Sequence, residues 1–320
     1  MRALLGLLCA LAAGWAHAQA RFSFGIVGDA PYNAREETQF AQMLGEINYE
    51  NLDFVVHVGD IKSGSSPCSD ELYEARKRLF QASRHPFILV PGDNDWTDCH
   101  RKRAGEYDPL ERLERLRQLF YANEQSLGQS TLKLEHQSDD PAARTAQFRR
   151  YRENVRWLVH GVLFIGLNIP GSNNNFGRTP QMNAEYAERG AANAEWLRQG
   201  FDLANRHGYA AVFIFIQANP DFDLSFLRRA NPTDGYAAFK QELLAYTLAY
   251  GKPVVLVHGD THRFRIDHPL VDPASLKRVE HFTRIESFGS PFVDWIKVTI
   301  DADNPKLFSL RTGWTLNYGQ

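Results

Sequence analysis

Four apolar segments of this 320-residue chain are each followed by a Gly-Asp pair, and this recurrence constrains the fold more than any other feature. One such pair is a common turn, but a pair repeated after buried strands is informative. In an open α/β sheet the carboxyl ends of the strands line the ligand crevice. We therefore expect four aspartates to converge at one edge of the fold. The pairs are Gly28-Asp29, Gly59-Asp60, Gly92-Asp93 and Gly259-Asp260.

Apolar, β-branched strands alternate with amphipathic helices along the chain. Strands are predicted over residues 22–27, 54–58, 87–90, 162–167, 211–216 and 254–257, and helices over 36–47, 70–82, 191–205 and 234–249. Two further segments, 296–300 and 306–311, are typical of a closing hairpin or edge pair. Buried strands between helices indicate a layered α/β fold. We predict a single domain over residues 21–320.

The charged segment 101–156 departs from this alternation. It contains one clear helix, with Asp108 as N-cap, Pro109 in the first turn and an apolar stripe that ends at Phe120. Such a stripe is typical of packing against a core. Residues 126–149 are polar, so we predict that 101–156 is an insertion, either a surface excursion or a cap.

The first 18 residues have the layout of a secretory signal peptide. Arg2 supplies a positive charge, residues 4–13 are mostly apolar, and Ala16-His17-Ala18 is a small-x-small cleavage site. The apolar run is shorter than the about 20 residues that cross a bilayer. These features predict a periplasmic or secreted protein with no membrane span after cleavage.

The cysteines fit an exported protein. Cys9 leaves with the predicted signal peptide, so Cys68 and Cys99 remain as an even pair in an oxidising compartment. We predict a Cys68–Cys99 disulfide, which stabilises the fold by roughly 3–4 kcal/mol on chain-entropy grounds. Two free thiols are the alternative.

The charge of the chain bounds its partners. The formal net charge is −2, and no basic run stands out. Nucleic acid is therefore not an expected partner. The sequence does not specify an oligomeric state.

Converging aspartates need positive charge between them. Two carboxylates about 4 Å apart repel by roughly 4 kcal/mol at an effective dielectric of 20. Several together cannot all stay ionised without a cation. With His262, the strand-end aspartates predict a divalent metal site. The alternative is that they are separate turn residues with solvated side chains.

The ordered blocks resemble those of the calcineurin-like metallophosphoesterases, and within them an exported bacterial branch. The family's second, third and fifth blocks correspond to residues 57–64, 90–96 and 257–262. The resemblance covers the chain from Asp29 to His262. It implies an α/β fold, a layered β-sandwich flanked by helices. It also implies hydrolysis of phosphate mono- or diesters of small molecules by a metal-activated water.

Several of the family's site residues are replaced in this chain. Where the family has histidines, Pro31 stands in the first block, Asn94 in the third, Gln217 in the fourth and Asp260 in the fifth, and Asp93 replaces an asparagine. Among the histidine ligands of the family, His262 is kept.

Carried over position by position, the resemblance implies two ligand sets that share Asp60. The first set is Asp29, Asp60 and His262, with Tyr32 as a candidate extra ligand, and the second is Asp60, Asp93 or Asn94, Gln217 and Asp260. The second set is all oxygen, which suits Mg, Mn or Ca better than Zn. One or two divalent ions are expected, and Mn, Mg, Fe, Zn and Ca all stay open.

The resemblance also implies roles in catalysis. Asp60, Asn94 and His262 form the candidate catalytic centre, and Lys62 and Asn94 are candidate contacts to the substrate phosphate. Because Asn94 stands where the family has its leaving-group histidine, either the leaving group is a good one or another residue donates the proton.

Three other histidines are candidate proton donors. His57 and His258 each lie on a strand just before a Gly-Asp pair, which favours a buried structural role. His100 lies in a loop, where a plain surface position is an equal alternative.

Two other functions stay open. A degenerate, inactive family member that binds a periplasmic ligand or partner is the main alternative, because three histidine ligands and the usual acid are replaced. A Ser-His-Asp esterase is poorly supported, because no Gly-x-Ser-x-Gly elbow is present.

Overall fold

The computed structural model describes residues 21–140, 146–222, 233–301, 304 and 307–313. The predicted signal peptide and the first residue of the predicted final strand lie outside these ranges. The strands are β1 (Phe22–Val27), β2 (Phe54–His57), β3 (Phe87–Leu89), β4 (Glu135–His136), β5 (Val155–Val159), β6 (Val162–Gly166), β7 (Ala211–Phe215), β8 (Val254–His258), β9 (Arg265–Asp267), β10 (Phe282–Glu286), β11 (Ile296–Ile300) and β12 (Phe308–Thr312).

The strands form two mixed sheets. The first has the order β12-β11-β1-β2-β3, and the second has the order β4-β5-β6-β7-β8-β10-β9. Strands β1, β2 and β3 run parallel, as do β6, β7, β8 and β10. Parallel strands place their carboxyl ends at one edge, so the segments after β1, β2, β3, β7 and β8 share that edge within their sheets.

Aromatic rings fill the space between the two sheets. Phe24 of β1 stacks on Phe54 of β2 at 4.9 Å between ring centroids. Both rings meet Phe164 of β6 edge to face, at 5.4 and 4.9 Å. Fully burying a phenylalanine contributes roughly 1.5–3 kcal/mol, so this layer is a major source of the adhesion between the sheets.

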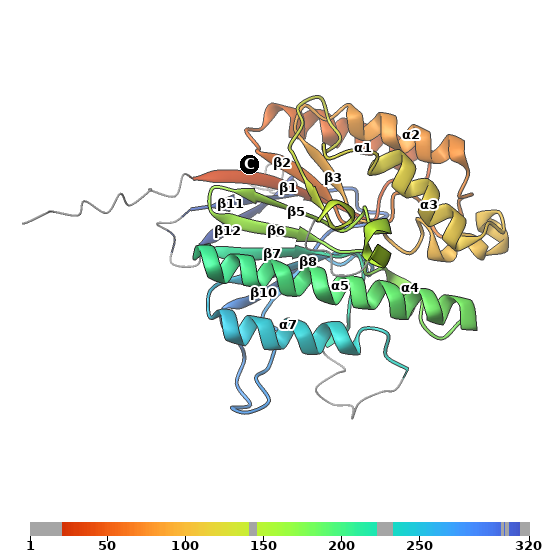
Figure 1. Ribbon diagram of the computed structural model, residues 1–320. Helices are drawn as coiled ribbons and strands as arrows, with labels where there is room; N and C mark the ends of the chain where they lie inside the picture. The colour runs from red at the N-terminus through yellow and green to blue at the C-terminus, as the bar shows by residue number, and fades with distance from the viewer. Residues whose placement is uncertain (1–20, 141–145, 223–232, 302–303, 305–306, 314–320) are drawn as a thin grey trace, which may run out of the picture.

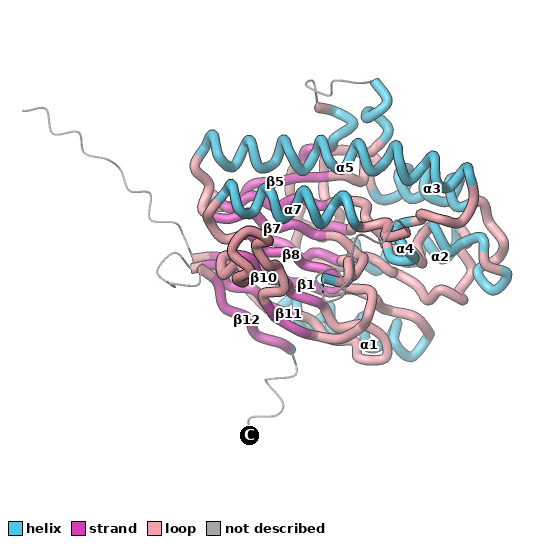
Figure 2. Tube along the Cα trace, turned by 90° about the horizontal axis from the view of Figure 1, so that it is seen from below, coloured by secondary structure: helices cyan, strands magenta, loops and turns pink. Residues whose placement is uncertain are grey.

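Helices cover both outer faces of the sandwich, as Figure 1 shows. On one side lie α1 (Ala34–Tyr49), α2 (Asp70–Gln81) and α3 (Pro109–Phe120), and on the other lie α5 (Pro180–His207) and α7 (Ala237–Tyr250). Seen from below, α5 and α7 run side by side across the second sheet (Figure 2). The predicted layered α/β fold is confirmed.

The alternation of side chains along the central strands explains why the two sheets lie between two layers of helices. In β7, Phe213 faces the aromatic layer, while Val212 and Ile214 pack in the second apolar cluster with Trp196 and Leu197 of α5. Successive side chains of a strand point to opposite faces. Because both faces are covered, both sets are apolar.

The segments read from the sequence match the structure with specific differences. Helix α5 begins at Pro180, eleven residues before the prediction, because Thr179 caps it by accepting from the Met182 N–H. Helix α3 matches its predicted bounds, and its residues Leu113 and Leu116 are buried in the core. The sequence did not indicate β4, β5 or β10.

Among the described residues, no helix is both long and apolar enough to cross a membrane.

Candidate metal centre

Three of the predicted ligands adopt the left-handed backbone conformation directly after a strand. The φ angles are 48° at Asp29, 58° at Asp60 and 79° at Asp260. A residue other than glycine pays of order 1–3 kcal/mol for such a conformation, which persists where the surroundings determine it. Each turn directs the chain out of its sheet at the carboxyl end of the strand.

Hydrogen bonds bring these strand ends together across the sandwich. The Asp29 N–H donates to the Gly59 carbonyl at 2.9 Å within the first sheet. The Asp260 N–H, from the second sheet, donates to both carboxylate oxygens of Asp29 at 3.1 Å. The predicted convergence of strand-end aspartates is therefore present, and it joins the two sheets.

Glycines leave the space that the carboxylates occupy. A Cβ at Gly92 would lie 2.1 Å from Asp60 Oδ1, and one at Gly259 would lie 2.0 Å from Asp29 Oδ2. Both distances are shorter than any tolerable contact. The glycines of these two pairs are needed because the carboxylate of another pair lies against each of them.

Burial and mutual repulsion dominate the electrostatics of the cluster. Burial raises the pKa of Asp29 well above its usual value, and the charges of Asp260 and Asp93 raise it further. Burial also raises the pKa of Asp60, again with the charge of Asp93. For Asp93, burial and the neighbouring charge of Asp98 raise the pKa to about 7. A cation would relieve this cost.

Asp60 lies at the centre of a polar network. Asn94 donates to it twice, from its backbone N–H to Oδ1 at 3.0 Å and from Nδ2 to Oδ2 at 2.7 Å. The Tyr32 hydroxyl donates to Oδ2 at 3.1 Å and lies 3.2 Å from His262 Nε2. Three predicted site residues and the candidate ligand Tyr32 are thus in contact.

His262 is oriented by the chain behind it. Its Nδ1 lies 2.6 Å from the Ser290 carbonyl, and its Nε2 lies 3.8 Å from Asp29 Oδ1. A carbonyl accepts only from a protonated nitrogen, so the bond places a proton on Nδ1. In the neutral imidazole Nε2 is then the acceptor, which is the state that a metal ligand needs.

Gln217 closes the cluster after β7. Its Oε1 accepts from the Gly171 N–H at 2.5 Å. Burial raises the pKa of both Asp29 and Asp260, and the nearby Gln217 amide offsets a small part of each rise. Within the described parts of the chain, its buried Nε2 has no hydrogen-bond partner in good geometry.

The amide-rich segment 168–175 follows a strand, and its sequence allows two interpretations, a lining of the substrate pocket or an ordinary turn. Four successive residues are left-handed, with φ of 51° at Ser172, 56° at Asn173 and Asn174, and 64° at Asn175. Asparagine tolerates this region better than most residues, and the Ser-Asn-Asn-Asn run was the signal available. Ser172 Oγ lies 2.5 Å from Asp93 Oδ2, so the turn covers the site.

A buried arginine of α5 holds this turn in place. Arg189 Nη1 donates to Asn174 Oδ1 at 2.6 Å and to the Asn168 carbonyl at 2.9 Å. Its Nη2 donates to the Asn174 carbonyl at 3.0 Å, and Glu185 compensates its charge. The surroundings thus impose the strained conformation.

The side chain of Lys62 points toward the backbone of the loop that carries it. It is fully buried, and Nζ donates to the carbonyls of Ser63 at 3.1 Å and Ser66 at 3.0 Å. Burial lowers its pKa, against the attraction of Asp95 and Asp60. Contact between Lys62 and a phosphate stays a prediction.

Two of the candidate proton donors are buried in the strands. Burial lowers the pKa of His57 to about 4 and that of His258 to about 3. His57 Nε2 lies 2.8 Å from the Ala30 carbonyl. Both rings are neutral near pH 7. His100 is the exposed last residue of the otherwise buried turn Thr97–His100, with Nδ1 against the Thr97 carbonyl.

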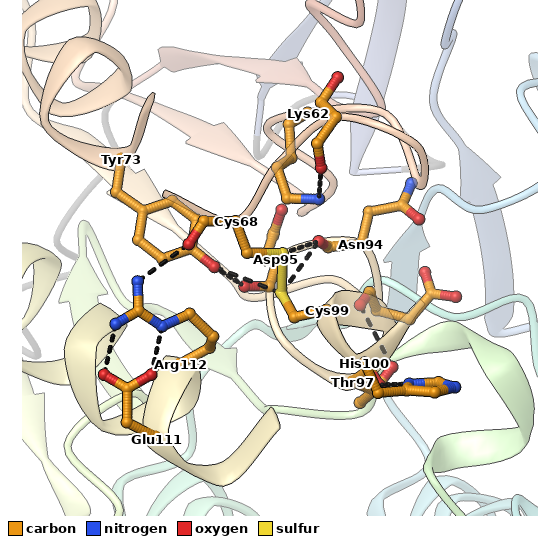
Figure 3. Close-up of a disulfide and its surroundings, with 12 residues drawn as sticks. Lys62, Cys68, Tyr73, Asn94, Asp95, Thr97, Cys99, His100, Glu111 and Arg112 are labelled. Carbon is orange, nitrogen blue, oxygen red and sulfur yellow. Dashed lines mark hydrogen bonds and ion pairs between the residues drawn. A yellow bond between two sulfur atoms is a disulfide. The ribbon is translucent and has the colours of Figure 1, made fainter. Parts of the chain in front are cut away.

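The predicted Cys68–Cys99 disulfide is present, with 5.7 Å between the Cα atoms. As Figure 3 shows, it lies behind the loop that carries Asn94, whose carbonyl is 3.8 and 3.9 Å from the two sulfurs. The disulfide therefore ties the loop after β2 to the loop after β3.

The chemical types of the candidate ligands suit a hard divalent cation. Carboxylate, amide and imidazole groups meet at a point where glycines leave room, and the carboxylates repel one another. As the side chains lie, no group of three or more His, Cys, Asp or Glu residues among those described could hold an ion. Asn94, Tyr32 and Ser172 hydrogen-bond to the carboxylates instead. A bound ion would exchange with these donors.

The fold is similar to two solved structures. PhoD has a TM-score of 0.53 and 12% identity, covering 88% of this chain and 64% of PhoD, so the chain spans less than two thirds of its length. A dimetal phosphatase from Danio rerio has a TM-score of 0.50 and 12% identity, covering 91% of this chain and 95% of that one. At such identity these likenesses concern the fold. No curated protein matches the sequence.

The sequence itself carries the family assignment. Residues 23–264, well over half of the chain, match the calcineurin-like phosphoesterase family. The matched span begins in β1 and ends just after His262, so it includes every predicted metal ligand. The resemblance seen in the sequence is confirmed, and this chain belongs to the calcineurin-like phosphoesterase family.

Proposed function

We propose that this chain hydrolyses phosphate mono- or diesters with one or two divalent metal ions bound at the strand-end cluster. The observation that carries the proposal is the contact from the Asp260 backbone N–H to the buried carboxylate of Asp29, which brings strand ends of the two sheets to one point. Membership of the phosphoesterase family supports it.

The ligand sets carried over from the family name the residues that would hold the ions. Asp29, Asp60 and His262 would take one ion, with Tyr32 beside them. Asp60, Asp93, Gln217 and Asp260 would take the other. A divalent ion bound there would lower the pKa of a water molecule to give a nucleophile and would neutralise charge on the phosphoryl oxygens.

The side chain at position 94 limits the choice of leaving group. The amide of Asn94 can donate a hydrogen bond to a departing oxygen, but it has no proton to transfer. His57 and His258 are buried and neutral, so they do not replace it. His100 stays a candidate donor; aryl phosphates, whose leaving groups need no protonation, do not depend on it and are the favoured substrates.

We also propose that the protein acts in the periplasm or outside the cell. The signal-peptide pattern over residues 1–18 and the disulfide, which needs an oxidising compartment, support this location. Fractionation of cells that express the full chain, with N-terminal sequencing of the product, tests it.

The test of activity uses the mature chain loaded separately with Mn, Mg, Fe, Zn or Ca. Metal content is measured by elemental analysis, and hydrolysis is measured with p-nitrophenyl phosphate and bis-p-nitrophenyl phosphate. We expect Asp60→Asn to lower kcat by about 10²-fold or more, because it removes a negative charge that both ligand sets share. Asp202→Asn, on the exposed face of α5, is the matched control.

The outcome separates the enzyme from a binding protein. Turnover that depends on metal and on Asp60, with Asp202→Asn unaffected, supports the enzyme. Metal binding without turnover of any phosphate ester supports the degenerate, ligand-binding alternative. A protein that takes up no divalent metal would contradict the proposed mechanism.

A further inference from the structure

A buried aspartate beside the metal centre forms ion pairs with two arginines. Asp98 lies in the turn Thr97–His100 and is 1% exposed. Arg178 pairs with its Oδ1, and Arg101 Nη2 lies 2.6 Å from its Oδ2. The Ser172 hydroxyl lies 2.9 Å from Oδ2. The same hydroxyl lies 2.5 Å from Asp93 Oδ2, so two carboxylates, two guanidinium groups and one hydroxyl meet at this point.

The two arginines differ in their surroundings. Arg178 is also bound to the Thr97 carbonyl through Nη1 at 2.7 Å, and its side chain is 23% exposed. The Arg101 side chain is 47% exposed. Among the residues that the structure describes, no hydrogen-bond acceptor is assigned to Arg101 Nη1. Arg101 therefore meets Asp98 through Nη2 and presents Nη1 to a ligand at the half-exposed rim.

Arg101 lies at the catalytic side of this group. A Cβ built on Gly64 would be 2.8 Å from Arg101 Nη1 and 2.7 Å from Asn94 Oδ1. The guanidinium and the Asn94 amide therefore share the space over Gly64. Asn94 in turn donates to Asp60 at 2.7 Å. Arg101, Asn94 and Asp60 are thus successive neighbours in space. They extend from the solvent-exposed rim into the metal centre.

The position of Arg101 is fixed by the chain around it. Cys99, between Asp98 and Arg101, is disulfide-bonded to Cys68 in the loop after β2. The Arg101 N–H also donates to the Asp98 carbonyl at 3.0 Å. The backbone that carries the guanidinium is thus held from two sides.

An anionic substrate needs such a group here. Asp60, Asp93 and Asp260 present negative charge to any phosphate that approaches, and Lys62 directs its ammonium to Ser63 and Ser66 instead. A guanidinium is a planar fork that binds two phosphate oxygens at once. We propose that Arg101, anchored by Asp98, binds the non-bridging oxygens of the substrate phosphate. This inference rests on the proposed hydrolysis of phosphate esters.

The test compares Arg101→Ala with Arg101→Lys and with Arg103→Ala in the metal-loaded mature protein. Arg103 is an exposed arginine of the neighbouring turn Lys102–Ala104 and serves as the matched control. The readouts are kcat and KM for p-nitrophenyl phosphate and the inhibition constant of inorganic phosphate. Thermal melting shows whether each variant is folded.

For Arg101→Ala we expect KM and the phosphate inhibition constant to rise roughly tenfold, with kcat changed by less than about threefold, since ground-state binding is lost. Arg101→Lys should recover part of the loss, and Arg103→Ala should match the wild type. If Arg101→Ala is folded and leaves both constants within about twofold of the wild type, the inference is overturned.

Failure of the proposed function would look different. If the wild type hydrolyses no phosphate ester, binding of inorganic phosphate is measured by calorimetry. Loss of that binding in Arg101→Ala alone would keep the anion site and reject turnover. Equal binding in all variants, or none in the wild type, would overturn the role of Arg101.

Discussion

The carboxylate of Asp95 accepts a hydrogen bond at 3.0 Å from the backbone N–H of Asp60. It accepts two more, from the N–H of Ile61 at 2.8 Å and the N–H of Gly92 at 2.7 Å. One fully buried carboxylate therefore joins the loop after β2 to the loop after β3. It also determines where the left-handed turn at Asp60 begins.

Asp95→Asn tests this relationship. The amide keeps one acceptor oxygen but turns its NH2 toward backbone donors, so we expect the free energy of unfolding to fall by roughly 2 kcal/mol. The turnover number should fall as well, because Asp60 moves. Urea unfolding and steady-state kinetics measure the two effects, with Asp202→Asn as control. Full activity in a destabilised Asp95→Asn protein would show that the bond does not position Asp60.

The close approach at Gly92 makes a second prediction. In Gly92→Ala the new Cβ would lie 2.1 Å from Asp60 Oδ1 and 2.5 Å from the Asp60 nitrogen, so we expect lost metal affinity and activity. Gly190→Ala is the control, because a Cβ there meets nothing within 4 Å inside helix α5. That change should raise stability by roughly 0.5–1 kcal/mol. Metal titration and thermal melting of both variants compare them directly.

The disulfide should matter for both stability and activity. Replacing Cys68 and Cys99 by serine removes a link across 31 residues, which we expect to lower the free energy of unfolding by roughly 3–4 kcal/mol. The Asn94 loop also loses its anchor, so KM and kcat should both change. Reductant added to the wild type should reproduce the effect and leave the double serine variant unchanged.

A buried ion pair gives a prediction for acid. Arg117 donates to Glu153 from Nε at 2.8 Å and from Nη2 at 2.7 Å. Burial raises the pKa of Glu153, but the charge and hydrogen bonds of Arg117 outweigh it, so the pKa lies below 4.5 in the folded protein. The stabilisation is complete above the unfolded pKa of 4.5 and is lost as pH falls through the lower, folded value.

Glu153→Gln should therefore be less stable by roughly 3–5 kcal/mol at pH 7, because Arg117 is left buried without its partner. The difference in the free energy of unfolding between this variant and the wild type should become smaller as pH falls below about 4.5. Glu114→Gln removes the half-exposed partner of Arg117 and should change stability by less than about 1 kcal/mol. Chemical unfolding from pH 3 to pH 7 measures this. A stability difference that is constant from pH 3 to pH 7 would contradict an ionised Glu153 in the folded protein.

The sequence predicted those parts of the fold that local pattern determines. Strands β6, β7 and β8 are continuous apolar runs because both faces are covered, and such runs are readable without a structure. Strand β10 was not found, because Arg284 and Glu286 interrupt its apolar pattern. Both side chains are nevertheless buried, and Arg284 donates to Asp267 of β9. Compensation by another strand is not visible in a local window.

The same limit applies to the metal centre. Asp29 and Asp260 were predictable because each follows a strand. Ser172 belongs to a loop whose sequence fits either a pocket lining or an ordinary turn, because its contact with Asp93 is made across the chain. Arg101 was not singled out, since a pair with Asp98 three residues away does not by itself indicate a ligand site. Lys62 has the residue type of a phosphate contact, but its direction was decided by two carbonyls of its loop, which no spacing rule describes.

The pairing of β1 with β11 has a consequence for the order of folding. Phe22, at the start of the first strand, lies opposite Ile300, at the end of the eleventh, and β1 lies between β11 and β2 in its sheet. Until β11 docks, β1, the strand that precedes Asp29, keeps an open edge. Metal capture should therefore follow the docking of β11, so uptake of the ion would report on the last step of folding and not on the first.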